Sequence, residues 1–378
     1  MPSPREALVI LNLIPGMGPI RIRSLLNHFG SPEIVLHSPK EFLRQIPYIS
    51  DRLAEAIASW RECTAFQAEF DLASRLGVHI TTLIDDDYPD ILRSLRTPPA
   101  VLYSLGAWRQ SDAYKAVALV GTRQATAYGS TIARQFGREL AEAGCTIISG
   151  LALGIDTAGH WGALDAGGRT LAILGSGLNA LFPAENRALA ERIAEEAGAV
   201  ISEFPLNLRP SKNTFPCRNR LVAGWSQAIL VAEAPHRSGA LHTARLGAEL
   251  GRSVFAIPGP INRPSSEGCH ELLRDGAILA ASTVHILNDM NWGTRGNPAQ
   301  GQLNFGQEGR LSRREEVLST DPTDRMIIES ILLGHSSIDQ LCPATGLSAM
   351  ELAPRLARLQ ISRIIVPLPG GRFKVQAG

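Results

Sequence analysis

A segment in the middle of the chain combines positive charge with an aromatic ring. Residues 204 to 232 include no acidic residue, and four basic side chains lie in this range: Arg209, Lys212, Arg218 and Arg220. Lys212 and Phe215 are three positions apart, so they offer an ammonium group and an aromatic face together. Single-stranded nucleic acid is bound by this mixture of cations and stacking faces. The segment therefore favours binding to a single-stranded nucleic acid.

The same residues also have a purely structural interpretation. Phe215 would then belong to the hydrophobic core, and Arg220 would form a buried ion pair with Glu203 or Glu233. The spacing by itself leaves both interpretations open.

One group of residues has the types needed for acid/base chemistry. Asp156 and His160 are four positions apart in GIDTAGH and would share one face of a helix. With Glu203 and Glu233 they form the only plausible acid/base set. No serine or cysteine has an evident activating partner, so structural roles are favoured and no catalytic residue is expected.

Metal and cofactor sites are not indicated. The acidic run from Asp85 to Asp90 includes Pro89, a combination typical of a solvated turn and a helix start. The five cysteines show neither zinc-ligand nor redox spacing, and they are too scattered for a disulfide framework. No full dinucleotide or P-loop fingerprint is present, so we expect no cofactor.

Five glycine-punctuated apolar segments must position these residues. They are AVALVGTR (116–123), TIISGLALGID (146–156), TLAILGSGL (170–178), AILVAEAPHRSGA (228–240) and SVFAIPGP (253–260). Short apolar runs without polar alternation are typical of parallel strands covered on both faces. Helical patterns at 130–143 and 186–198 lie between them. The pattern predicts a doubly wound, Rossmann-like α/β sheet.

The loops after these strands are the expected ligand site. In doubly wound sheets, ligands bind outside the carboxyl ends of the strands. Glycines collect at these ends: Gly121, Gly150, Gly175, Gly177, Gly239 and Gly259. Backbone amides at helix starts favour an anion, and Arg123 lies beside one loop. Phosphate is therefore the expected ligand group.

The flanks predict further domains. Residues 1–80 predict a small helical domain in which Ile14 to Pro19 resembles a helix-hairpin-helix turn, although its glycines also fit a plain turn between helices. Residues 81–290 form the Rossmann-like domain, and 291–318 are polar enough to be a flexible linker. Residues 319–378 predict three helices and a hairpin, as in a winged helix. Pro354 and the modest basicity of that domain favour partner binding over DNA contact.

The overall composition is that of a globular protein. The hydrophobic fraction is 44% and the formal net charge is +1, so any electrostatic footprint must be local. No apolar run is long enough to span a bilayer, and no leader segment opens the chain. We expect a cytoplasmic protein without membrane association.

The motifs taken together resemble the DNA-processing protein A family, also called Smf. The matching segments run in order through the central domain: VGTRQATAYG, SGLALGIDTAGHWGAL, LGSGLNALFPAEN, SEFP, FPCRNRLVAG, VAEAPHRSGALHTA and GRSVFAIPGP. The flanks fit as well, because many members carry a sterile-alpha-motif-like or helix-hairpin-helix-like amino-terminal domain and a winged helix.

The resemblance implies a cytoplasmic, homodimeric protein that is not an enzyme. Members of the family bind single-stranded DNA, protect it from nucleases and load the RecA recombinase during natural transformation. Carried over by position, the resemblance and the loop glycines give these nucleic-acid-binding residues: Gly121, Arg123, Ser149, Gly150, Gly175, Ser176, Gly177, Lys212, Phe215, Arg218, Asn219 and Arg220. His270 and Cys217 depart from the residues usual in the family.

Two other functions are compatible with parts of the pattern. One is a regulator that binds double-stranded DNA through the winged helix. The other is an enzyme related to nucleoside-monophosphate phosphoribohydrolases, in which SGALHTA would be followed closely by a catalytic glutamate. Here the next carboxylate is Glu249, well down the predicted helix, which counts against the enzyme.

Overall fold

The structure is a computed structural model that describes residues 2–63, 65–292, 322–332, 335, 337–361, 365–368 and 372–375. Two compact units divide the chain, Met1–Arg295 and Gly296–Gly378. The linker predicted at 291–318 lies outside the described residues except for Asn291 and Trp292. The domain boundary predicted near residue 80 falls inside the first unit and stays a prediction.

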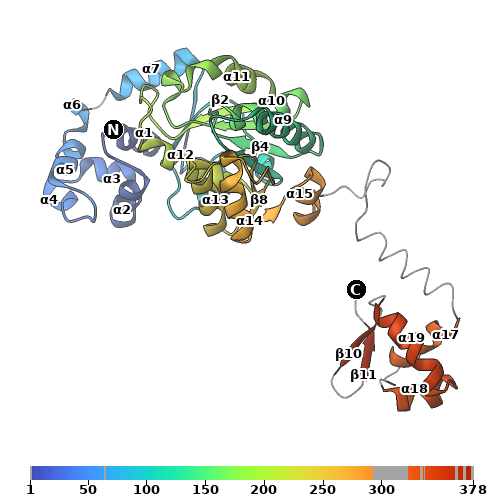
Figure 1. Cartoon of the computed structure of the whole chain (residues 1–378). Helices are drawn as coiled ribbons and strands as arrows, with labels where there is room; N and C mark the ends of the chain where they lie inside the picture. The colour runs from blue at the N-terminus through green and yellow to red at the C-terminus, as the bar shows by residue number, and fades with distance from the viewer. Residues whose placement is uncertain are drawn as a thin grey trace. The chain divides into compact units, whose positions relative to one another are not determined.

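The first unit begins with short helices (Figure 1). They are α1 (Pro4–Leu13), α2 (Pro19–Phe29), α3 (Pro32–His37), α4 (Lys40–Leu43), α5 (Asp51–Ala58), α6 (Trp60–Cys63) and α7 (Phe66–Leu76). A capping box starts α1, because the Ser3 amide donates to the Glu6 carboxylate at 2.7 Å and the Ser3 hydroxyl accepts from the Glu6 amide. The buried faces of these helices share one core with Val101 and Val200 of the sheet.

The sheet of the first unit confirms the α/β prediction. Its strands are β1 (His79–Thr82), β2 (Val101–Gly106), β3 (Ala116–Val120), β4 (Thr146–Ser149), β5 (Thr170–Ile173), β6 (Gly198–Ser202), β7 (Ala228–Val231), β8 (Ser253–Ala256) and β9 (Ile278–Leu279). They pair in the order β1-β2-β6-β5-β4-β3-β7-β8-β9. In this spatial order, all strands from β6 through β5, β4, β3, β7 and β8 to β9 are parallel, whereas β2 is antiparallel to both β6 and β1. The five strands predicted from apolar runs are β3, β4, β5, β7 and β8.

Helices cover both faces of the sheet. They are α8 (Asp90–Arg93), α9 (Ala127–Glu142), α10 (Ile155–Asp165), α11 (Arg187–Arg192), α12 (Thr214–Trp225), α13 (Gly239–Glu249), α14 (Glu267–Arg274) and α15 (Thr283–Asp289). Val117 and Leu119 of β3 pack with α9, α10 and α15, whereas Ala118 and Val120 pack with α12, α13 and α14. This alternation fills both layers of core and fixes which helix starts face the strand ends.

The second unit contains α17 (Pro322–Leu332), α18 (Ile338–Thr345), α19 (Ala349–Ile361) and an antiparallel pair of strands, β10 (Ile365–Leu368) and β11 (Arg372–Val375). Its winged-helix character stays a prediction. Asp324 of α17 is fully buried, and it accepts from Arg355 at 3.0 Å and from Arg358. Two arginines of α19 are thus engaged by a carboxylate of their own unit.

The sequence predicted neither a membrane span nor a metal site, and the described residues allow one observation on each. No helix in the described part of the chain combines the length and apolar character needed to cross a bilayer. Within the same residues, no cluster of three or more His, Cys, Asp or Glu side chains is arranged to hold a metal. The Asp85 carboxylate instead accepts from the Thr82 amide at 2.8 Å and closes a turn.

Candidate nucleic-acid interface

A cavity of about 360 Å³ opens at the point where the strand order of the sheet reverses. From β3 the chain crosses to β4, which is its neighbour on one side. From β7, the neighbour of β3 on the other side, the chain crosses to β8 in the opposite direction, so the loops after β3 and β7 diverge here. Its wall consists of the loop after β3, the loop after β4, one face of α12 and the start of α13. Three of the glycines expected at the ligand site, Gly121, Gly150 and Gly239, line this cavity, whereas Gly177 and Gly259 do not.

A stacked pair of side chains stands in this cavity. The guanidinium carbon of Arg123 lies 4.7 Å from the centre of the Phe215 ring. The ring of Phe182 lies 6.0 Å from that of Phe215, and both rings line a second, adjoining cavity of about 120 Å³. Phe215 is half-buried rather than part of the closed core. It therefore supports a cation on its ring at the edge of a cavity that can receive a planar group.

The loop that carries Arg123 is held by Glu233. The Glu233 carboxylate accepts from the Thr126 amide and from the Thr126 hydroxyl, both at 2.9 Å. Its backbone carbonyl accepts from the Thr122 amide at 2.7 Å. Glu233 is 4% exposed. Its contacts therefore assign it to fixing the loop after β3 and the start of α9.

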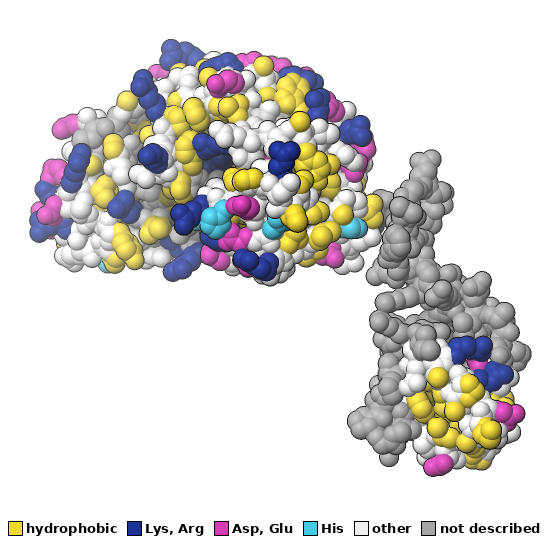
Figure 2. Space-filling view, in the orientation of Figure 1, with side chains coloured by type: hydrophobic (Ala, Val, Ile, Leu, Met, Phe, Trp, Pro, Cys, Tyr) yellow, Lys and Arg dark blue, Asp and Glu magenta, His cyan; other side chains and the backbone are white. Residues whose placement is uncertain are grey.

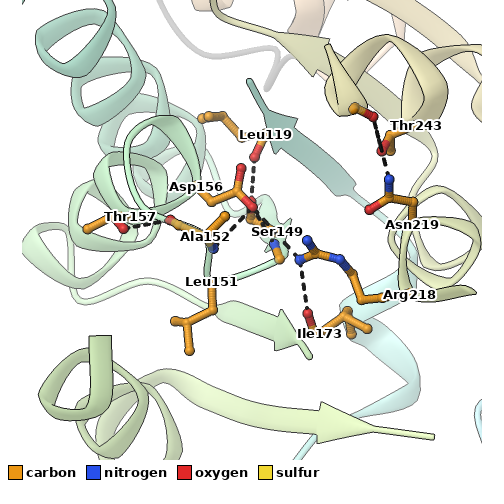
Figure 3. A network of polar contacts seen from close by, with 12 residues as sticks. Leu119, Ser149, Leu151, Ala152, Asp156, Thr157, Ile173, Arg218, Asn219 and Thr243 are labelled. Carbon is orange, nitrogen blue, oxygen red and sulfur yellow. Dashed lines mark hydrogen bonds and ion pairs between the residues drawn. The ribbon is translucent and has the colours of Figure 1, made fainter. Parts of the chain in front are cut away.

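Arg218 forms a buried cationic wall of both cavities (Figure 3). It is 5% exposed, and its Nη1 lies 3.2 Å from the Ile173 carbonyl oxygen and 3.9 Å from the Asp156 carboxylate. The same carboxylate accepts from the Gly150 amide at 3.0 Å. A Cβ on residue 150 would collide with the Arg218 guanidinium, so a larger residue there would displace that side chain. Burial raises the pKa of Asp156, and Arg218 opposes that rise.

The predicted loop residues fall into two sets. Seven of them line the two cavities: Gly121, Arg123, Gly150, Gly175, Phe215, Arg218 and Asn219. The others do not line either cavity: Ser149, Ser176, Gly177, Lys212 and Arg220.

Three loop residues of the second set, Ser149, Ser176 and Gly177, form internal hydrogen bonds. The Ser149 hydroxyl donates to the Leu119 carbonyl at 2.6 Å, and the Gly177 amide donates to the Leu208 carbonyl at 2.8 Å. The Ser176 side chain is fully buried, and its carbonyl accepts from the Ser202 hydroxyl at 2.7 Å. These groups shape the loops beneath the cavities.

Lys212 and Arg220 have opposite environments. Lys212 is exposed just before α12 and has no hydrogen bond or ion pair with any described residue. Arg220 instead donates to the Thr97 carbonyl at 2.8 Å and to the carboxylate of Glu203, which is 5% exposed. Burial raises the pKa of Glu203, whereas Arg220 lowers it. The structural interpretation of Arg220 thus agrees with its contacts, whereas Lys212 is available to a phosphate.

His160 lies in the core rather than at the cavity. It is fully buried, and its Nδ1 lies 2.7 Å from the Thr170 hydroxyl. Burial, aided by the charge of Arg218, lowers the pKa of His160 to about 3. A neutral imidazole without solvent access has no geometry for proton transfer to a ligand.

Sequence reasoning missed several lining residues. Ser238 and Thr243 at the start of α13 line the larger cavity beside Gly239, which the sequence had placed among the loop glycines, and Phe182 lines the smaller one. The signal for the first group was present in SGALHTA, a serine N-cap followed by glycine after an apolar strand. Of the two departures from the family, His270 contacts the Gly259 carbonyl at 2.9 Å, and Cys217 is exposed on α12.

The two adjoining cavities together form a crevice with cationic and aromatic side chains in its wall. The fold and this crevice define a class: a doubly wound α/β protein with a ligand-sized crevice at the switch point of its sheet. The chain belongs to the DNA recombination-mediator protein A family, whose model matches residues 79–291. It is 32% identical to protein Smf of Synechocystis sp., over 96% of this chain and 96% of that protein.

Two solved structures are similar to this chain. DNA processing protein A of Streptococcus pneumoniae matches with a TM-score of 0.66 and 29% identity, covering 76% of this chain and 99% of that one. DNA processing protein A of Helicobacter pylori matches with a TM-score of 0.50 and 30% identity, covering 56% of this chain and 96% of that one. The latter was described for its mode of binding single-stranded DNA.

We predict that Arg220→Ala destabilises the fold. Removing the guanidinium leaves the buried Glu203 carboxylate without its partner, which typically costs about 3 to 5 kcal/mol of the free energy of unfolding. Urea unfolding measures this loss, and Glu203→Gln in the same chain should reverse most of it. Lys212→Ala, at an exposed position, is the control. An Arg220→Ala protein of unchanged stability would contradict the structural role.

We also predict acid sensitivity from His160. Its folded pKa of about 3 lies below the value near 6.5 of the unfolded chain, so the unfolded state binds the extra proton first. The contribution of His160 to stability is therefore complete above about pH 6.5, and it falls by about 1.4 kcal/mol per pH unit below that. Unfolding measured from neutral to mildly acidic pH should show a shallower slope in His160→Gln. The exposed His242→Gln is the control, and equal slopes in all three proteins would refute the assignment.

Proposed function

We propose that this protein binds single-stranded DNA in the crevice at the switch point of its sheet. The observation that carries the proposal is the Arg123–Phe215 stack, with a ring-to-guanidinium distance of 4.7 Å, beside the buried Arg218. Stacking faces are indifferent to base identity, and cations attract every phosphate alike. Binding should therefore tolerate any sequence and weaken with salt.

Each group has a part in this binding. Arg123 and the exposed Lys212 contact phosphates, and Phe215 and Phe182 offer faces to a base. Arg218 contributes a positive field from within the wall, because its nearest carboxylate is 3.9 Å away. The start of α13 adds the partial positive charge of a helix N-terminus to the same cavity. All four contributions favour a negatively charged, base-bearing chain.

Membership in a recombination-mediator family supports the role that we infer for this binding. The protein holds single-stranded DNA, protects it from nucleases and loads a RecA-type recombinase onto it. It acts in the cytoplasm as a homodimer and requires no cofactor.

An enzymatic function is disfavoured by the positions of the acids. Asp156, Glu203 and Glu233 are all engaged by internal partners. Glu249 is the last residue of α13, and Thr243 is the last residue of that helix to line the cavity. Because an α-helix rises about 1.5 Å per residue, Glu249 lies roughly 9 Å further along the helix axis than the cavity wall. We therefore propose a binding protein rather than a catalyst.

We predict that Arg123→Ala and Lys212→Ala each weaken binding to single-stranded DNA. Each change removes one phosphate contact, so the slope of log affinity against log salt should fall by about 0.7. Fluorescence anisotropy of single-stranded and duplex oligonucleotides across a salt series measures both affinity and slope. Arg52→Ala, an exposed arginine of α5, is the control. Wild-type isotherms for both variants, or equal binding of duplex and single strand, would refute the site.

We predict that Phe215→Ala costs about 1 to 3 kcal/mol of binding free energy, because a stacked base loses its partner. Phe215→Tyr should keep most of the affinity. The same anisotropy titration gives the difference, and urea unfolding verifies that the variant is folded. A folded Phe215→Ala protein with wild-type affinity would return this ring to a purely structural role.

A further inference from the structure

Two acid-free segments meet at a cavity outside the crevice. Residues 7–32 contain no Asp or Glu, and neither do residues 91–111, although Asp85, Asp86, Asp87 and Asp90 directly precede the second segment. The first segment carries Arg21 and Arg23, and the second carries Arg93, Arg96 and Arg109. A cavity of about 310 Å³ lies where α2 faces the chain leading into β2. In Figure 2, Lys and Arg side chains are scattered over the visible face of the first unit, several of them near α2 and α12.

The walls of this cavity combine apolar side chains with two arginines and an asparagine. One face of α2, with residues at helical spacing, forms one wall: Pro19, Ile22, Arg23, Leu26 and Asn27. The other wall comes from the segment between β1 and β2: Leu83, Arg93, Leu95, Pro98 and Ala100. The volume is in the range of ligand sites. A flat apolar group joined to an anion, as in a nucleotide, fits such a lining.

The two arginines of these walls differ in their freedom. Arg93 donates to the carbonyls of Leu83 and Asp85, the latter at 3.0 Å, so it stiffens the wall. Arg23 is exposed and has no hydrogen bond or ion pair with any residue of the described part. Arg23 is therefore the group available to an incoming phosphate.

Helix α12 lies between the crevice and the wall of the 310 Å³ cavity, although none of its residues lines that cavity. Phe215, Arg218 and Val222 face the crevice from one side of this helix. Arg220 and Gly224 follow Arg218 and Val222 by two positions, so they lie on the side of the helix that faces away from the crevice. There, Arg220 donates to the Thr97 carbonyl at 2.8 Å, and a Cβ on Gly224 would lie 2.8 Å from the Leu95 side chain. From Phe215 to Gly224 an α-helix rises about 14 Å.

We propose that the cavity between α2 and the segment 83–100 binds a further nucleotide of the same single strand. The base enters between Ile22, Leu26 and Leu95, and a phosphate contacts Arg23. This inference rests on the proposed function, because the strand first occupies the crevice on the other side of α12. The amino-terminal helices thereby lengthen the binding site.

Oligonucleotide length separates the two sites. A strand of about 6 nucleotides covers the crevice alone, whereas one of about 20 reaches over α12. For the long strand, Arg23→Ala should weaken binding about tenfold, because one charge-assisted contact is lost. It should also lower the slope of log affinity against log salt by about 0.7. For the short strand, Arg23→Ala should bind as the wild type does. Asn27→Trp, which fills the cavity from its wall, should reproduce the loss, and Arg52→Ala should bind both strands normally.

The outcomes distinguish this inference from the proposed function. If Arg23→Ala and Asn27→Trp bind the long strand like the wild type while Arg123→Ala loses both strands, the second site is refuted and the crevice stands. A loss in Arg23→Ala that is confined to duplex DNA would also overturn the assignment. If the wild type binds neither single strand, the proposed function fails, and the second site fails with it.

Discussion

The site depends on a buried cation at the point where the sheet reverses. Arg218 is 5% exposed, and burial of a charge is costly unless the charge is paired and hydrogen-bonded. Among the described residues, Arg218 pairs with one carboxylate, that of Asp156, at 3.9 Å. The same carboxylate also accepts from the Gly150 amide. The guanidinium is therefore only partly neutralised. Beside the Arg123–Phe215 stack, it gives the crevice a positive field that a phosphate would complete, at a position that the doubly wound topology leaves open to ligands.

The amino-terminal helices contribute to this site from a distance. Asn12 of α1 donates to the Glu203 carbonyl at 3.2 Å, and Glu69 of α7 accepts from the Leu206 amide at 2.7 Å. Glu69 is 6% exposed, and burial raises its pKa. Both contacts hold the segment that leads from β6 to Lys212. The helices thus support the proposed binding surface, and they share a core with the sheet.

Local pattern was sufficient for the central strands. The segments of β3, β4, β5, β7 and β8 are apolar on both faces because helices cover the sheet on both sides, and this condition is visible in the sequence. The remaining strands gave weaker signals. β9 has two residues, and β2 lies next to the amino-terminal helices, where its antiparallel pairing with β6 follows from the path of the whole chain. No local pattern encodes that pairing.

The sequence by itself determined the fold class, the glycine-bearing strand ends and the presence of cations around Phe215, because these follow from periodicity and residue type. Only the tertiary structure decided which of these cations is paired, which is buried and which is exposed. Arg220 pairs with Glu203, Arg218 lies buried beside Asp156, and Lys212 remains exposed, although all three come from one short segment. The physical reason is that an ion pair is set by distances between elements far apart in the chain. Helix α12 sends Arg218 and Arg220 to different sides. The partners of Arg218 come from α10 and the end of β5, whereas those of Arg220 come from the residue after β6 and the segment before β2.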